Sequence, residues 1–295
     1  MKKLTQKLVL SVITMALVVV ALGTSTFAWF TLTDTARVDT FSAQVQGGNG
    51  ILVSLDNVNF YTVIDSTAIQ AYLTAEYGAS YTLTDRTSYE GRVLRDRLEN
   101  TVTDGFIEFV VYFRSDAALV IDVDGVEISG ATKQWTPDVE FIGASGTTVV
   151  AGTPITVNAY DAARVSITNV TDLSLGTDGT TTYIYKTNQT EVFGDLTKGA
   201  VAYWNAVNTG TTSDITTGPD VTPTTGAFEL ANSALLEGTS GLADQLLTLT
   251  ETGAGTGIFK GAAKVRVWIE GWDPDAYNSI FNAGLTVAVQ FKKQP

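Results

Sequence analysis

Apolar and polar residues alternate at short intervals over most of the chain after residue 36. Runs rich in Val, Ile, Phe and Tyr are separated by Gly, Asp and Asn, a pattern typical of short β-strands joined by turns. It predicts strands over residues 37–46, 51–56, 105–113, 117–129, 147–160, 163–170, 263–272 and 283–291. Many short strands with turn signals favour an all-β fold, and we expect a jelly-roll-like β-sandwich.

Two glycine-containing turns are predicted between strands. The sequence GGNG at 47–50 separates two apolar runs and predicts a hairpin that joins residues 37–46 to 51–56. The dipeptide Asp124-Gly125 predicts a second turn, which divides 117–129 into two short strands.

Helix is predicted sparsely. Residues 66–78 have a helical composition, and Gly78 is expected to end that helix. Residues 89–100 favour either an amphipathic helix or the start of a strand, and residues 196–208 and 226–238 predict short helices. Asp273 followed by Pro274 predicts one helical turn over 273–282, with Asp273 as its cap.

The first 28 residues have a different pattern. A basic start with three lysines precedes an apolar run over 8–22, and Thr26 and Ala28 occupy the −3 and −1 positions of a small-residue cleavage site. We expect a signal peptide over 1–28, followed by a single β-sandwich domain over 29–295 with a Thr-rich surface loop at 209–226. Residues 8–33 carry no charge, so an uncut leader is long enough to anchor the chain in a membrane. A buried core helix is the third alternative.

Composition narrows the functional classes. The chain of 295 residues has 18 basic and 31 acidic residues, and loss of the three leader lysines takes its net charge from −13 to −16. Such a surface repels phosphate backbones, so nucleic acid is not an expected partner. Because Cys and His are both absent, disulfides, His-dependent nucleophilic catalysis and ordinary zinc sites are excluded.

The junction between leader and domain resembles that of the TasA/camelysin group of secreted biofilm-matrix fibre proteins. The residues that carry the resemblance are Gly23, Thr26, Phe27, Ala28, Trp29, Phe30, Thr40 and Phe41. The resemblance implies that a dedicated signal peptidase cuts after Ala28, so that the mature chain begins at Trp29. It also implies a jelly-roll-like domain that polymerises, in which the N-terminal segment of one subunit completes a sheet of its neighbour.

Carried over to this chain, residues 29–40 would be the donor strand, with Trp29, Phe30, Leu32 and Val38 as its apolar contacts. The main expected partner is therefore another copy of the chain. An added strand gains main-chain hydrogen bonds and side-chain pockets, and a head-to-tail contact that does not close produces a filament. Two alternatives remain: Trp29 and Phe30 pack onto their own domain, or they lie at a membrane interface.

Two pairs of acidic residues are weak candidates for calcium, which prefers six to eight oxygen ligands. They are Asp122 with Asp124, and Asp273 with Asp275. A turn for the first pair and a helix cap for the second are the favoured interpretations, and no other cofactor is expected.

The segment around Trp268 and Trp272 offers a weak candidate for stacking on a sugar. Glu270 and Asp273 could be imagined as a catalytic carboxylate pair. Simple strand packing is favoured, because Val267 and Ile269 alternate with an aromatic stripe that we expect on the outer face. We therefore expect a non-enzymatic, extracellular or cell-surface structural protein that self-assembles into filaments. A monomeric or membrane-anchored adhesin or carbohydrate-binding module is the alternative, and a carboxylate hydrolase is a third.

Overall fold

The computed structural model divides the chain into two compact units, residues 1–35 and 36–295. The structure describes part of the second unit only: residues 41–48, 50–78, 83–96, 98–187, 194–209, 215, 217–218, 228–230, 245–277, 280 and 284–294. The leader, the cleavage position and the predicted donor strand lie outside the described residues, as does most of the Thr-rich loop. Among the described residues, no helix has the length and apolar character needed to cross a bilayer.

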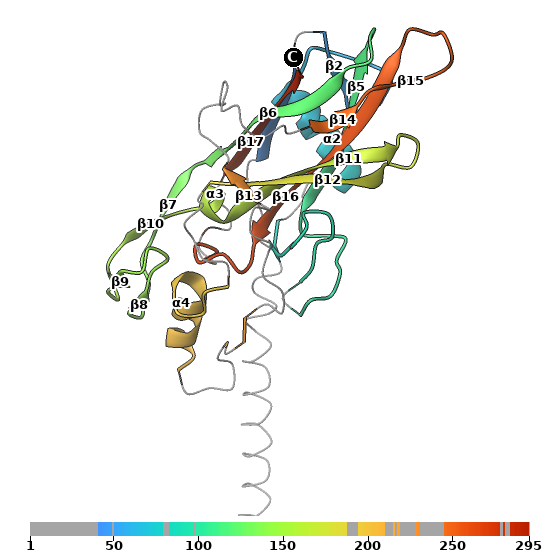
Figure 1. Cartoon of the computed structure of the whole chain (residues 1–295). Helices are drawn as coiled ribbons and strands as arrows, with labels where there is room; N and C mark the ends of the chain where they lie inside the picture. Colours follow the sequence, from blue (N-terminus) through green and yellow to red (C-terminus); the bar gives the residue numbers. More distant parts are fainter. Residues whose placement is uncertain are drawn as a thin grey trace, which may run out of the picture. The chain divides into compact units, whose positions relative to one another are not determined.

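The described chain is an all-β sandwich of two sheets, which confirms the predicted fold class (Figure 1). One sheet has five strands in the order β14-β6-β17-β1-β3. Their bounds are Gln245–Thr248, Val120–Gly130, Leu285–Lys293, Phe41–Gly47 and Val63–Ile64. All neighbours in it are antiparallel except β1 and β17, which pair in parallel from Phe41 opposite Leu285 to Gly47 opposite Phe291.

The second sheet has eight strands and follows the order β13-β12-β11-β16-β5-β2, with β15 and β4 also paired to β16. The bounds on the main path are Phe228–Leu230, Thr177–Lys186, Ala163–Asp172, Phe259–Glu270, Ile107–Ser115 and Leu52–Ser54. The two further strands are Thr250–Glu251 (β15) and Asp85–Arg86 (β4). The long β16 lies between β11 and β5 and is the centre of this sheet.

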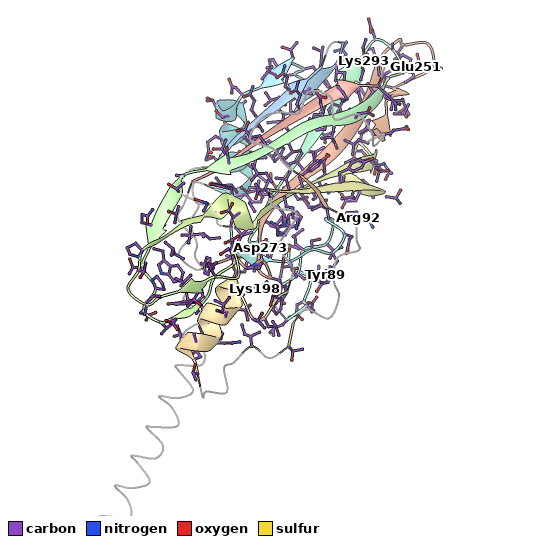
Figure 2. All side chains as sticks on the ribbon, turned by 60° about the vertical axis from the view of Figure 1, so that its left-hand side comes forward. Tyr89, Arg92, Lys198, Glu251, Asp273 and Lys293 are labelled. Atoms are coloured by element: carbon purple, nitrogen blue, oxygen red, sulfur yellow. The ribbon has the colours of Figure 1, made fainter. Side chains whose placement is uncertain are left out.

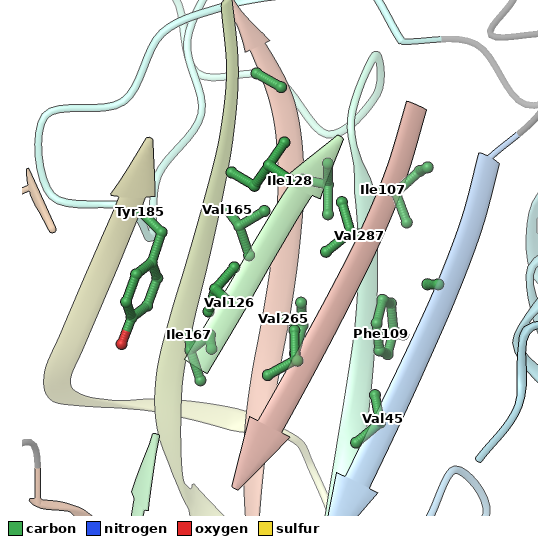
Figure 3. Packing of buried hydrophobic residues seen from close by; sticks show 14 of the residues in the cluster. Val45, Ile107, Phe109, Val126, Ile128, Val165, Ile167, Tyr185, Val265 and Val287 are labelled. Atoms are coloured by element: carbon green, nitrogen blue, oxygen red, sulfur yellow. The ribbon is translucent and has the colours of Figure 1, made fainter. Parts of the chain in front are cut away.

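The core lies between the inner faces of the two sheets, where apolar side chains from both meet (Figure 3). Val126, Ile128 and Val287 of the five-stranded sheet face residues of β11, β16 and β5 in the other sheet. At one end of the core the rings of Phe113 and Phe291 pack edge to face with centroids 4.8 Å apart, and both are fully buried. In β5 every second residue is buried, as the alternating sequence pattern predicts.

Two ribbons and three helices complete the described fold. Strand β7 (Thr132–Trp135) pairs with β10 (Ile155–Asn158), and β8 (Phe141–Ile142) pairs with β9 (Thr148–Val149). Helix α4 (Gly199–Val207) lies beside these ribbons, where Tyr203 packs against Trp135 and Phe141. Helix α2 (Ser66–Tyr77) confirms the helix predicted to end at Gly78, and α3 (Ala159–Ala162) is a single turn.

The predicted hairpin at 47–50 is wrong. Strands β1 and β2 belong to different sheets, because β1 pairs with β17 and β3 whereas β2 pairs with β5. The Gly48 N–H donates to the Phe291 carbonyl at 2.8 Å, so this end of β1 stays bound to β17 before the chain crosses to the other sheet. The crossing allows Val45 and Val53 to bury in the same core from opposite sides.

The predicted turn at Asp124-Gly125 is also wrong, because β6 runs through it without reversing. Opposite this point the register passes from Gln290 paired with Gly125 to Phe291 paired with Val123, which leaves Asp124 as an extra residue. Asp124 therefore marks a β-bulge. The other corrections are local: residues 89–96 form no helix, Asp273–Tyr277 form hydrogen-bonded turns rather than a helical turn, and 228–230 are a strand.

The contact between Phe113 and Phe291 generates a stability prediction. Replacing Phe291 with Ala removes a fully buried ring from the inter-sheet core, and we expect the free energy of unfolding to fall by about 3–5 kcal/mol. Chemical denaturation followed by circular dichroism measures this change. The neighbouring Gln290→Ala, on the half-buried outer face, should cost less than about 1 kcal/mol, and an equal loss in both variants would contradict the inter-sheet packing.

Candidate functional site

If copies of this chain assemble by strand addition, the acceptor must be a sheet edge whose backbone groups lack a partner. The two sides of the sandwich differ in how far the backbone of their edge strands is covered by other described residues.

On one side of the sandwich the edges are covered. Val53 of β2 is bridged to Tyr61, just before β3, and α2 packs against β1, with Ile69 and Leu73 fully buried in the core. The Tyr77 hydroxyl, at the end of α2, donates to the Glu108 carbonyl at 2.8 Å and accepts from the Glu108 N–H at 3.1 Å. At Glu108 a side chain thus takes the place of a strand partner beside β5.

On the other side, β6 is open over much of its length. Strand β14 pairs with β6 only from Val120 to Asp122, whereas β17 pairs with the opposite edge of β6 as far as Gly130. Within the described part of the chain, no strand pairs with the outer edge of β6 over residues 123–130. Val126 and Ile128 in this stretch are each only 3% exposed, so the inner face is packed while the backbone edge lacks a strand. We call residues 123–130 the open edge.

The first acidic pair lies at one end of the open edge. Asp122 is buried, and this burial raises the pKa of its carboxyl, with Asp124 acting in the same direction and Lys292 in the opposite one. The Lys292 ammonium lies 2.8 Å from an Asp124 carboxylate oxygen. This lysine already supplies the positive charge that a calcium ion would bring.

The second acidic pair lies in the turn after β16. The Asp273 carboxylate is paired with the Arg164 guanidinium and also accepts from the Asp275 N–H at 2.9 Å. Asp273 is far from Lys293, the residue opposite Ile121 in the sheet, so the two acidic pairs do not form one site (Figure 2). No group of three or more acidic side chains suited to a metal occurs in the described ranges.

The two tryptophans of the predicted aromatic stripe are not exposed. Trp268 is fully buried and Trp272 is 5% exposed, so neither ring offers a face to a sugar. Trp268 does lie on the outer side of β16, but Leu94, Ile184, Val102 and Phe106 cover it in a small second core. The prediction of an exposed aromatic platform is therefore wrong, because sequence alternation does not reveal a third layer above the sheet.

Glu270, at the end of β16, is also fully buried. It accepts a hydrogen bond from the Trp268 indole N–H at 3.1 Å and another from the Trp272 backbone N–H at 3.3 Å. Burial raises the pKa of Glu270 to about 7, although Arg164, these donors and Thr87 act in the opposite direction. A carboxyl in this position has no access to a bulk substrate.

The sequence did not indicate the partners of these acids. Arg164 and Thr87 lie far from Glu270 along the chain, and only the β11–β16 and β4–β16 pairings bring them together. One signal was present: Arg164 interrupts an otherwise apolar and hydroxyl-bearing strand, and a buried guanidinium requires a carboxylate partner.

The pair of Arg164 and Asp273 supports a second stability prediction. Arg164→Met leaves the Asp273 and Glu270 carboxyls buried without a cation, and we expect a loss of about 3–5 kcal/mol in the free energy of unfolding. The control is Lys198→Met, which removes a partly exposed pair with Asp195 and should cost less than about 1 kcal/mol. Denaturant titration of both variants measures the difference, and similar values would show that the buried pair is not structurally important.

Comparison with known proteins gives no family or function for this chain. No protein-family model matches the chain, and no curated protein or solved structure is significantly similar to it. The likeness to the TasA/camelysin group therefore rests on the residues around the leader junction and stays an expectation.

Proposed function

We propose that this chain is an exported, non-enzymatic structural protein whose copies join into extracellular or cell-surface filaments. In this proposal, residues 29–40 of one subunit add a strand to the open edge of β6 in the next. The observation that carries the proposal is the difference between the two sides of the sandwich. One side is covered by α2 and the Tyr77 hydroxyl, whereas residues 123–130 have no strand partner in the described part of the chain.

The dimensions of the edge suit such a donor. Each residue of a paired strand advances the chain by about 3.3 Å, so the eight residues of the open edge span about 26 Å, which the twelve residues of the segment 29–40, about 40 Å when extended, are long enough to cover. The open edge contains neither Pro nor Lys, which are common protections against strand addition, although it does contain Glu127 and the bulge at Asp124. Burial of Trp29, Phe30 and Leu32 is worth on the order of 5 kcal/mol before ordering costs.

A donor can reach either its own edge or that of a neighbour. Phe41, where β1 begins, pairs with Leu285, which in turn pairs with Gly130 at the end of β6. A strand added beside β6 would lie three strand spacings from β1, because β17 and β6 come between them. At about 4.8 Å for each spacing, this distance is about 14 Å. The same contacts can therefore form within one chain or between chains, as in domain swapping. We propose that residues 29–40 pair with the open edge of another chain.

The other functions considered from sequence receive less support. A carbohydrate-binding module that uses Trp268 and Trp272 requires exposed rings, and both are buried. A hydrolase that uses Glu270 and Asp273 requires carboxyls open to substrate, and these are also buried, with Asp273 bound to Arg164.

Substitution within the donor tests the proposal. In the exported protein, the triple change Trp29→Ala, Phe30→Ala and Leu32→Ala removes the apolar contacts, and we expect filaments to give way to folded monomers. Negative-stain microscopy and sedimentation velocity measure the change, with circular dichroism to confirm folding. The matched control, Thr31→Ala with Thr33→Ala, alters polar residues of the same segment and should still polymerise. Unchanged filaments in the triple variant would exclude this donor.

Cysteine cross-linking tests the acceptor edge directly, because the natural chain has no cysteine. Glu127 lies between the inward-facing Val126 and Ile128, so its side chain is on the outer face of β6. One preparation carries Glu127→Cys and the other Thr31→Cys, on the face of the donor opposite to Leu32, and we expect a disulfide-linked dimer when they are mixed under oxidising conditions. Ala68→Cys, on the exposed side of α2, is the control acceptor and should not cross-link. In a chain that carries both Thr31→Cys and Glu127→Cys, a disulfide that forms only within the monomer would show that the segment folds onto its own edge.

A further inference from the structure

A single buried cation serves two buried carboxyls at the end of β16. Arg164 is 3% exposed, and its guanidinium pairs with Asp273 and donates to the carbonyls of Ala163 and Asp161. Its charge is thus already balanced before Glu270 is considered. If Glu270 were ionised as well, this site would hold an excess negative charge that no water could solvate, which is costly in a protein interior.

The other charged groups described around this site do not balance this charge. The turn after β16 contributes Asp273 and Asp275, and Asp161 of α3, whose pKa burial raises, lies near both of them. From the segment before β5, Asp85 lies beside Gly271, and Tyr89 lies near Glu270 with its hydroxyl bound to Glu99 and its ring against Arg95. Arg86 lies opposite Glu270 in the sheet, but its guanidinium pairs with Asp104.

Glu270 lies where residues 83–96, which we call the cover segment, join the sheet. Strand β4 of the cover segment pairs with β16 at Ile269 and Glu270, and the Gly271 N–H donates to the Arg86 carbonyl at 2.9 Å. The Thr87 hydroxyl faces the carboxyl without a hydrogen bond of ordinary length. Strand β4 and the Thr87 hydroxyl are thus the parts of the cover segment that lie against Glu270.

The rest of the cover segment lies on the outer face of the eight-stranded sheet. The Ser166 hydroxyl donates to the Gly91 carbonyl, and the Arg92 guanidinium donates to the Gly179 carbonyl at 3.0 Å. Gly91 has a φ of +71°, and a Cβ there would come within 2.8 Å of Ile184. Leu94 closes the small core over Trp268. Trp268 is thus a built-in reporter, because it binds Glu270 directly and is covered by this segment.

We propose that Glu270 is a pH-sensitive latch, which fixes the cover segment to the end of β16 while its carboxyl carries a proton and loosens it when the proton is lost. The direction follows from linkage. With the segment closed, the pKa of Glu270 is raised from its ordinary 4.5 to about 7. With the segment open, the carboxyl is solvated and returns toward the ordinary value. The closed state then holds more protons between these two values, so closure is strongest in acid, weakens as the pH rises to about 7 and then levels off.

Hydrogen–deuterium exchange of the full-length protein tests the latch. Protection factors of cover-segment amides should fall by about two orders of magnitude from pH 5 to pH 8, whereas those of α2 should change much less. Trp268 should become more accessible to acrylamide quenching over the same range, measured as the difference between the wild-type protein and Trp268→Phe because the chain has five tryptophans. Glu270→Gln, a neutral side chain of the same shape, should abolish both changes, and the exposed Glu140→Gln should preserve them.

Several results would overturn the latch. These are equal protection of the cover segment at both pH values, an equal loss of protection in α2, or a pH response that persists in Glu270→Gln. If Glu270→Gln does not fold, infrared spectroscopy of the wild-type protein tests whether the Glu270 carboxyl carries a proton at pH 5. The stretching band of a protonated buried carboxyl must be present at pH 5 and lost by pH 8, and its absence at pH 5 rejects the proposal. None of these measurements depends on assembly.

Discussion

At the edge of a β-sheet, backbone N–H and C=O groups point away from the last strand, and each must find another partner. In this sandwich that requirement is met differently on the two sides. Helix α2 and the Tyr77 hydroxyl cover one side, whereas on the other β14 covers only the first residues of β6 among the described strands. Beneath the open edge Val126 and Ile128 are buried, so within the described part of the chain the backbone edge lacks a partner and the inner face does not. The proposed mode of assembly follows from this difference.

Much of the sandwich could be predicted from sequence because its strands are half-buried and therefore alternate. Two of the errors within the sheets concern what the chain does at a glycine. In β6 the buried apolar positions are Ile121 and Val123, then Val126 and Ile128. The three-residue step between Val123 and Val126 is the mark of a bulge, which keeps the same face inward, whereas a turn would reverse the chain. At Gly47–Gly48 the local sequence gives no sign that β1 and β2 join different sheets, since that choice is made by distant partners.

The buried cluster at the end of β16 shows where sequence reasoning ends. Trp268 lies on the outer side of β16, as the alternation predicts. The burial of Trp268, Glu270 and Trp272 could not be predicted, because it depends on the cover segment. That segment has no regular hydrophobic pattern and contacts the outer face of the sheet at isolated residues. The pairing of Arg164 with Asp273 is equally remote in sequence. Such polar clusters depend on tertiary placement, which a local pattern does not encode.

The parallel pairing of β1 with β17 has a consequence for biosynthesis. The first described strand and the last lie side by side, so the five-stranded sheet cannot close until the ribosome has made residues 285–293. Contacts between residues this distant in sequence also form slowly, because closing a large loop costs conformational entropy before the contacts can stabilise the sheet. A nascent or truncated chain would lack the centre of this sheet and remain unfolded. Delayed closure of this kind is compatible with passage through a narrow translocation channel, in which a domain that folded early would become trapped.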